Sequence, residues 1–211
     1  MNAFVKICGL ATEEDVHHTI EAAPDAMGFI FWAKSPRGVT AESVSHWTHN
    51  RMPPGIRKVG VFVDSTVHEI EKSAEEAGLD VVQLHGSYTA RQIRELTYPV
   101  WRVLHVDRLP EDWNDEPVEA LLVDSGTVKM PGGTGVRVNT ERAIRLIRQS
   151  NFPVLLAGGL KQDTVSGVIK DTLPNGVDVS SGVELHPGKK DMNAVQFFIK
   201  NARSAFSSLP R

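Results

Sequence analysis

Cysteine is almost absent from this chain, because Cys8 is the only one among its 211 residues. A single thiol excludes an internal disulfide, and disulfides are common in small secreted domains. The amino terminus also lacks an apolar stretch long enough for a signal peptide or a membrane span. We therefore expect a cytoplasmic protein that has no membrane partner.

The chain also lacks a strong excess of acidic or of basic residues. The 26 acidic and 23 basic residues leave a formal net charge of −3, which gives no reason to expect nucleic acid as a partner. Small molecules remain open as ligands. His17, His18, His46 and His49 fall on expected helices, far from the strand ends, so we expect no metal site.

Apolar runs of strand length recur about every 20 to 30 residues, each followed by a turn signal and a helix-like segment. Eight such units in a chain this short favour an α/β fold with a single closed (β/α)8 barrel over residues 1–211, rather than an open sheet. The fifth unit is the weakest, because residues 107–117 are acidic and contain proline. The expected strands are Phe4 to Ile7, Met27 to Phe31, Arg57 to Val63, Val81 to Leu84, Val100 to His105, Ala120 to Val123, Val154 to Ala157 and Gly176 to Val179. The expected helices include Thr12 to Ala23, Thr66 to Ala77, Thr89 to Leu96, Thr140 to Gln149, Gln162 to Lys170 and one that starts near Asp191.

The carboxyl ends of the strands are where such a barrel carries its active site. Because side chains alternate along a strand, Cys8 shares a face with Lys6, His85 with Gln83, and Ser180 with Asp178. Polar residues spaced by two therefore belong on the inner face. The residues at the expected strand ends are Cys8, the loop 33–37, Asp64, His85, Asp124, Gly158 with Gly159, and Ser180 to Gly182.

Cys8 has two interpretations. A lone cysteine beside a strand is usually an inert packing residue. A catalytic role needs positive charge nearby, because a free thiol is only slightly ionised at neutral pH. Lys6 is the nearest cation in sequence, but strand 8 closes against strand 1, so we expect Asp178 to form an ion pair with Lys6.

Asp124 and Arg37 are further candidates for the site. Asp124 follows a run of apolar residues, so it is either an acid at the barrel mouth or a cap for the loop that follows. Arg37 lies in the loop after the second strand, where a guanidinium is suited to grip a substrate carboxylate. Solvation is the simpler role for a loop arginine. His85 and Asp64 are interpreted as supporting polar residues at the mouth.

Three glycine-containing turns come late in the chain. They contain Gly133, Thr134 and Gly135, then Gly158 and Gly159, and finally Ser180, Ser181 and Gly182. Glycine lets backbone N–H groups approach a ligand closely, and barrels often bind phosphate after strands 7 and 8. One glycine pair alone is ordinary turn chemistry, whereas three turns at consecutive strand ends favour phosphate binding.

The whole chain resembles the phosphoribosylanthranilate isomerase family, and the order and spacing of several short motifs carry the resemblance. These motifs are Lys6-Ile7-Cys8-Gly9, Ser35-Pro36-Arg37, Val59-Gly60-Val61-Phe62-Val63, Gln83-Leu84-His85-Gly86, Gly132-Gly133-Thr134-Gly135, Ala157-Gly158-Gly159-Leu160, and Val179-Ser180-Ser181-Gly182-Val183-Glu184 followed by Pro187-Gly188 and Lys190-Asp191.

The resemblance implies an Amadori rearrangement without cofactor, in which a phosphoribosyl aminoaldose becomes a ketose. It implies that Asp124 is the general acid that protonates the furanose ring oxygen. Cys8 would be the general base that removes the C2 proton, and Arg37 would face the anthranilate carboxylate. The glycine turns would hold the phosphate.

Two departures from the family pattern touch the loops. Val136 to Asn139 follow Gly135 where the family usually has Phe-Asp-Trp, and Ser87 with Tyr88 stand where it often has an acidic residue. With these altered loops, the sequence is compatible with a second, related aminoaldose substrate. It is also compatible with a monomer and with a homodimer. Competing interpretations are the similar histidine-pathway isomerase, which uses two aspartates, a metal-dependent epimerase, and a catalytically silent barrel.

Overall fold

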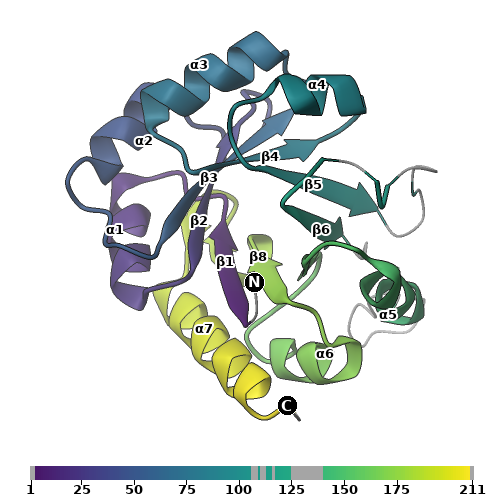
Figure 1. The fold of residues 1–211 in the computed structure, drawn as a ribbon. Coiled ribbons are helices and arrows are strands. Elements are labelled where there is room, and N and C mark those ends of the chain that lie inside the picture. Colours follow the sequence, from purple (N-terminus) through teal and green to yellow (C-terminus); the bar gives the residue numbers. More distant parts are fainter. Residues whose placement is uncertain (1–2, 106–108, 110–112, 116, 125–139, 210–211) are drawn as a thin grey trace.

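Eight parallel strands form a closed barrel in chain order, and β8 pairs back onto β1 (Figure 1). The computed structural model describes residues 3–105, 109, 113–115, 117–124 and 140–209. The predicted (β/α)8 barrel is confirmed, and four of the eight strands have the predicted bounds. The strands are β1 (Phe4–Cys8), β2 (Ala26–Phe31), β3 (Arg57–Val63), β4 (Val81–His85), β5 (Val100–His105), β6 (Ala120–Asp124), β7 (Val154–Ala157) and β8 (Gly176–Val179).

Helices surround this barrel on its outside (Figure 1). The described residues between β5 and β6 form turns and contain no helix, in the segment that the sequence marks as the weakest unit. Within the described ranges, no helix is both long and apolar enough to cross a bilayer. The helices are α1 (Glu13–Ala22), α2 (Ala41–Thr48), α3 (Val67–Ala77), α4 (Ala90–Glu95), α5 (Thr140–Gln149), α6 (Val165–Thr172) and α7 (Met192–Ser207).

Threonine side chains fix several of the helix starts. Thr12, Thr66 and Thr89 accept hydrogen bonds from backbone N–H groups of the first turn, as predicted from the sequence. Such caps contribute about 1 kcal/mol each. The helix α6 begins three residues and ends two residues later than predicted, and the Thr164 side chain before it bonds to Lys161 and does not cap the helix.

The alternation along each strand separates an outer core from the barrel interior. Val5 and Ile7 of β1 are fully buried and belong to the same apolar cluster as Phe198 of α7. Lys6 and Cys8 alternate with them and point to the other side, into the barrel. The polar residues that the pattern places inward are therefore inside.

The interior at the amino ends of the strands is filled by apolar side chains. Trp101 is fully buried there, in a cluster with alanine, valine and leucine from the neighbouring strands. Its ring centroid lies 5.7 Å from that of Phe4 in an edge-to-face arrangement. Its indole N–H donates to Glu119 over 2.8 Å. This packing closes one end of the barrel and leaves the other end for a site.

A small hairpin follows β8 and was not predicted. It consists of the 3-10 turn η1 (Ser181–Val183) and the short strands β9 (Glu184–His186) and β10 (Lys189–Lys190). Asp15 of α1 ties the hairpin down, since its carboxylate accepts from Lys190 N at 3.0 Å and from Lys189 Nζ at 2.9 Å. The hairpin therefore lies against the loops that follow β1 and β2.

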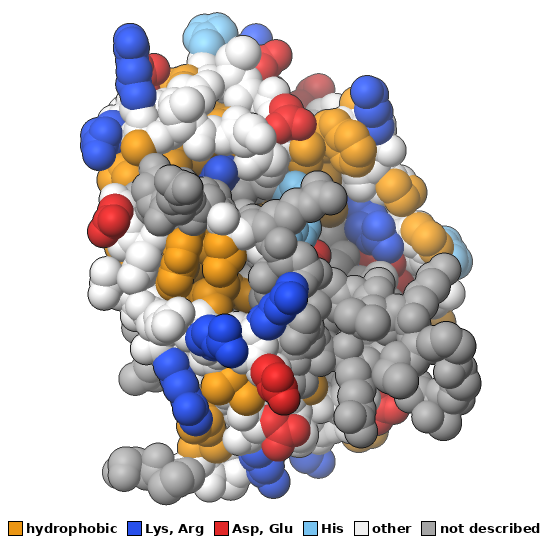
Figure 2. All heavy atoms as spheres, turned by 90° about the vertical axis from the view of Figure 1, so that its right-hand side faces the viewer, with side chains coloured by type: hydrophobic (Ala, Val, Ile, Leu, Met, Phe, Trp, Pro, Cys, Tyr) orange, Lys and Arg blue, Asp and Glu red, His pale blue; other side chains and the backbone are white. Residues whose placement is uncertain are grey.

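The surface carries both signs of charge. On the face in Figure 2, basic and acidic side chains are intermixed. This agrees with the nearly balanced composition of the chain.

Candidate active site

A cavity of about 270 Å³ opens at the carboxyl ends of the strands, and each of the eight strands contributes at least one lining residue. Five polar side chains point into it from inward strand positions, which agrees with the predicted alternation. Turns after β7 and β8 complete the wall. The polar lining residues are Cys8, Gln83, His85, Asp124, Asp178, Ser180 and Ser181.

Cys8 ends β1 and is 94% buried, with 6% of its surface exposed to the cavity side of the barrel. Gly28 lies opposite it on β2. A Cβ at Gly28 would stand 2.7 Å from Cys8 Sγ and 3.0 Å from Lys6 Nζ. The absence of a side chain at this position therefore makes room for the thiol and the ammonium beside each other.

The predicted ion pair between Lys6 and Asp178 is confirmed, with Nζ and Oδ1 2.9 Å apart. Burial alone would lower the pKa of Lys6, but Asp178 and Cys8 outweigh it and raise that pKa. Burial raises the pKa of the Cys8 thiol above its ordinary value, while Lys6 acts in the opposite direction. Cys8 is thus a strong base once deprotonated, and a buried cation favours its charged form.

Asp124 is the last residue of β6, and it lines the same cavity as Cys8. His85 lines the cavity at the end of β4, and its ring centroid lies 5.4 Å from that of His105. Burial lowers the pKa of His85, and His105 lowers it further, so the imidazole is neutral at pH 7. The two predicted proton-transfer residues therefore share one pocket, with a neutral imidazole in its wall.

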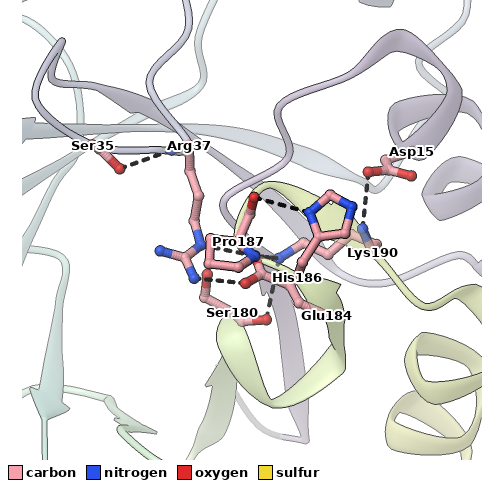
Figure 3. Close-up of polar contacts among 8 residues, drawn as sticks. All are labelled: Asp15, Ser35, Arg37, Ser180, Glu184, His186, Pro187 and Lys190. Carbon is pink, nitrogen blue, oxygen red and sulfur yellow. Dashed lines mark hydrogen bonds and ion pairs between the residues drawn. The ribbon is translucent and has the colours of Figure 1, made fainter.

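Arg37 lies in the loop between β2 and α2, where the sequence places it, but it does not form part of the cavity wall. Its Nε and Nη2 donate to the two carboxylate oxygens of Glu184 at 2.8 and 2.6 Å (Figure 3). Ser180 is adjacent: a Cβ on Gly9 would stand 2.7 Å from both Arg37 Cδ and Ser180 Oγ. Arg37 therefore lies at the rim of the cavity.

The glycine turns after β7 and β8 line the cavity together. Gly158 and Gly159 have φ of +89° and +64°, a region that favours glycine. A Cβ on Gly182 would collide with the carbonyl oxygen of Leu160, so these two turns touch through backbone. The third predicted turn, Gly133, Thr134 and Gly135, lies outside the described residues.

Two buried polar atoms in the cavity wall have no hydrogen-bond partner within the described part of the chain. They are Ser180 Oγ and Gln83 Oε1. Buried polar atoms are normally paired, so these two are suited to contact a bound polar ligand. Across the described residues, no group of three or more metal-ligating side chains comes together.

Sequence reasoning assigned no role to three residues that shape this region. Gly28 carries no local signal, because its importance depends on what lies across the strand pair. Glu184 appears only within a motif of the resemblance, and Lys190 only as part of another. Gln83 was placed on the inner face by alternation, and that signal was sufficient to find it.

Comparisons with known proteins agree with this geometry. The sequence profile described as N-(5'phosphoribosyl)anthranilate (PRA) isomerase matches residues 5–201. The N-(5'-phosphoribosyl)anthranilate isomerase of Geobacter sp. (strain M21) is 38% identical over 202 residues, which cover 94% of this chain and 97% of that protein.

Solved structures show the same likeness. A phosphoribosyl anthranilate isomerase in complex with reduced 1-(o-carboxyphenylamino)-1-deoxyribulose 5-phosphate is 30% identical, with a TM-score of 0.81, covering 97% of this chain and 100% of that one. Monomers generated from the dimeric enzyme of Thermotoga maritima are 29% identical, with a TM-score of 0.79 and the same coverage.

Proposed function

The chain belongs to the N-(5'-phosphoribosyl)anthranilate isomerase family and is an isomerase of tryptophan biosynthesis, and from this premise we propose how its residues carry the reaction. The reaction is the Amadori rearrangement of N-(5-phosphoribosyl)anthranilate to 1-(o-carboxyphenylamino)-1-deoxyribulose 5-phosphate. One observation carries the assignment: Cys8 and Asp124 come from β1 and β6 and line a single cavity.

Asp124 is the general acid of the first step. Its carboxyl gives a proton to the furanose ring oxygen, the bond from that oxygen to C1 breaks, and the nitrogen lone pair forms the Schiff base. The position at the end of a buried strand supports this role, because the carboxyl lies in the cavity wall. A well-placed acid of this kind contributes on the order of 10²- to 10⁴-fold in rate.

Cys8 is the general base of the second step. Its thiolate takes the proton from C2, and the electron pair left behind neutralises the iminium to give an enolamine, which tautomerises to the ketone. The carbon acid is weak, so a base with a raised pKa is advantageous. The Lys6 ammonium beside the thiol favours the thiolate that must be present before the proton moves.

Substrate binding uses the rim and the late turns. Gly158, Gly159 and the turn Ser180 to Gly182 hold the phosphate through backbone N–H groups and the unpaired Ser180 hydroxyl. The turn Gly133 to Gly135 joins them in this proposal. Arg37 binds the anthranilate carboxylate from the rim, next to Ser180.

The proposal treats residues 1–211 as one catalytic domain that works in the cytoplasm on a small phosphosugar. The two steps transfer protons and break one C–O bond of the substrate, and the change from aldose to ketose is internal to the substrate, so this scheme uses no cofactor or metal. The protein acts as a monomer or a homodimer, and light scattering coupled to gel filtration distinguishes the two. Neither nucleic acid nor membrane is a partner in this scheme.

The fluorescence of the anthranilate group tests the proposal. Purified protein added to N-(5-phosphoribosyl)anthranilate is expected to abolish the anthranilate emission without any other enzyme. The double variant Cys8→Ala/Asp124→Ala serves as the blank, and Arg91→Ala, on the exposed side of α4, as the matched active control. Emission that persists with the wild-type protein and the Arg91 variant would refute the assignment.

A further inference from the structure

Glu184 is buried, although the proposed reaction gives it no role. Its side chain is 3% exposed, at the base of the hairpin formed by β9 and β10. Oε1 accepts from Arg37 Nε and from Lys190 Nζ, both at 2.8 Å, and Oε2 accepts from Arg37 Nη2 at 2.6 Å (Figure 3). Both carboxylate oxygens are therefore bonded to cations.

The pairing with Arg37 is side-on, and this fixes the plane of the guanidinium. A guanidinium has five N–H donors, and the contact with Glu184 uses one on Nε and one on Nη2. No side chain of the described residues accepts from the end-on edge, formed by Nη1 and the second N–H of Nη2, and this edge has the geometry to bind a second planar carboxylate. Because the Arg37 side chain is only 19% exposed, its alternative rotamers are limited.

Glu184 is also bonded to a buried lysine. Arg37 and Lys190 are two cations that share the single Glu184 carboxylate, and the Lys190 side chain is fully buried. Lys190 Nζ also donates to the Ser180 carbonyl oxygen at 3.2 Å, which joins this corner to a turn of the cavity wall.

We propose that Glu184 is a positioning residue that orients Arg37 for the ring carboxylate of the substrate, and that Lys190 holds Glu184 in place. The site then binds an aryl amine with a ring carboxylate more tightly than an aryl amine without one. The inference rests on the proposed function, since it assumes that the substrate aryl group lies at the rim beside Arg37.

Binding of two stable ligands tests this inference separately from turnover. The first ligand is reduced 1-(o-carboxyphenylamino)-1-deoxyribulose 5-phosphate, and the second is the same compound without the ring carboxyl group. Calorimetry on the full chain gives the affinity ratio of the two. In Glu184→Gln we expect the carboxylated ligand to bind on the order of 10- to 100-fold more weakly, because a charged hydrogen-bond pair is lost. The affinity for the second ligand is expected to stay within about 3-fold.

A double-mutant cycle with Arg37→Met shows whether Glu184 acts through Arg37. In that background, Glu184→Gln is expected to cause no further loss of affinity for the carboxylated ligand. The matched control is Lys189→Met, which removes the ion pairs of the same hairpin to Glu14 and Asp15 without touching Arg37. It is expected to keep the wild-type ratio. Glu184→Asp provides a second variant that keeps the charge but shortens the reach, and we expect it to lose the ratio as well.

Equal losses for both ligands in Glu184→Gln, or a loss that persists in the Arg37→Met background, would overturn the inference and leave Glu184 as a support for the hairpin. The proposed function fails differently, because it fails if wild-type protein does not quench the anthranilate emission. Weak binding of both ligands to the wild-type protein would contradict the premise on the substrate and the inference with it.

Discussion

The two ends of the barrel interior are built from the same strands and differ in almost every physical property. At the amino end, Trp101 is fully buried and packs with Phe4 and the short aliphatic residues around it. At the carboxyl end, Cys8, Asp124 and Asp178 line a cavity. Residues that stabilise the fold and residues that line the site therefore lie in different layers of the interior. Substitutions in one layer should change the free energy of unfolding, and substitutions in the other should change kcat.

Removal of the proposed acid or the proposed base should give the largest effect. Cys8→Ala and Asp124→Ala are each expected to reduce kcat on the order of 10²- to 10⁴-fold, because each removes one proton-transfer group. Thermal unfolding should change little, since the cavity layer contributes less packing than the closed end. Steady-state fluorescence assays and melting curves check both expectations. A variant with near-normal kcat would remove that residue from its role.

Removal of the Trp101 ring at the amino end should lower stability and leave kcat unchanged. Trp101→Ala is expected to lower the free energy of unfolding by about 3 to 5 kcal/mol, because a fully buried aromatic side chain leaves a cavity. The folded fraction should retain kcat, since the residue lies outside the site. Denaturant titration and an activity assay normalised to folded protein test this. If kcat falls while stability is preserved, the two layers are not separable.

The substitution Gly28→Ala tests whether the space beside Cys8 is needed for activity. The added Cβ would stand 2.7 Å from Cys8 Sγ, so the thiol must shift. Misplacement of a catalytic group by about 1 Å can cost 10²-fold, and we expect a loss of that order in kcat with a modest change in stability. The matched control is Gly167→Ala in α6, where a Cβ meets nothing within 4 Å. That control is expected to keep full activity and to gain about 0.5 to 1 kcal/mol of stability.

The pH dependence should give the smallest effect, and it tests the proposed base. Burial raises the pKa of the Cys8 thiol, with Lys6 opposing it, and the base acts only when deprotonated. Rising pH fills the thiolate form, so kcat/KM should increase through the alkaline range, above the ordinary thiol pKa of about 8.5. The residual activity of Cys8→Ala should lack this rise. An identical profile in both proteins would show that the rise belongs to another group.

Much of the barrel was predictable because its signals are local. The strands β3, β5, β7 and β8 have the predicted bounds, and in three of them the apolar run ends at a turn residue, Asp64, Gly158 or Ser180. Helix starts at Thr12 and Thr66 followed from their capping side chains. The hairpin of β9 and β10 was missed because strands of three and two residues are too short to show a period.

The order of strands and turns follows from the amino-acid pattern alone, and this order places Cys8 and Asp124 at strand ends that share the cavity. It also determined the pair of Lys6 with Asp178, which are 172 residues apart, because closure of a parallel barrel sets the register of β1 against β8. Only the tertiary structure decided that Arg37 meets Glu184, 147 residues away. Arg37 lies on a loop and Glu184 begins the short strand β9 outside the barrel, so neither the barrel register nor a helix period restricts the contact. The packing of the rim brings the two side chains together.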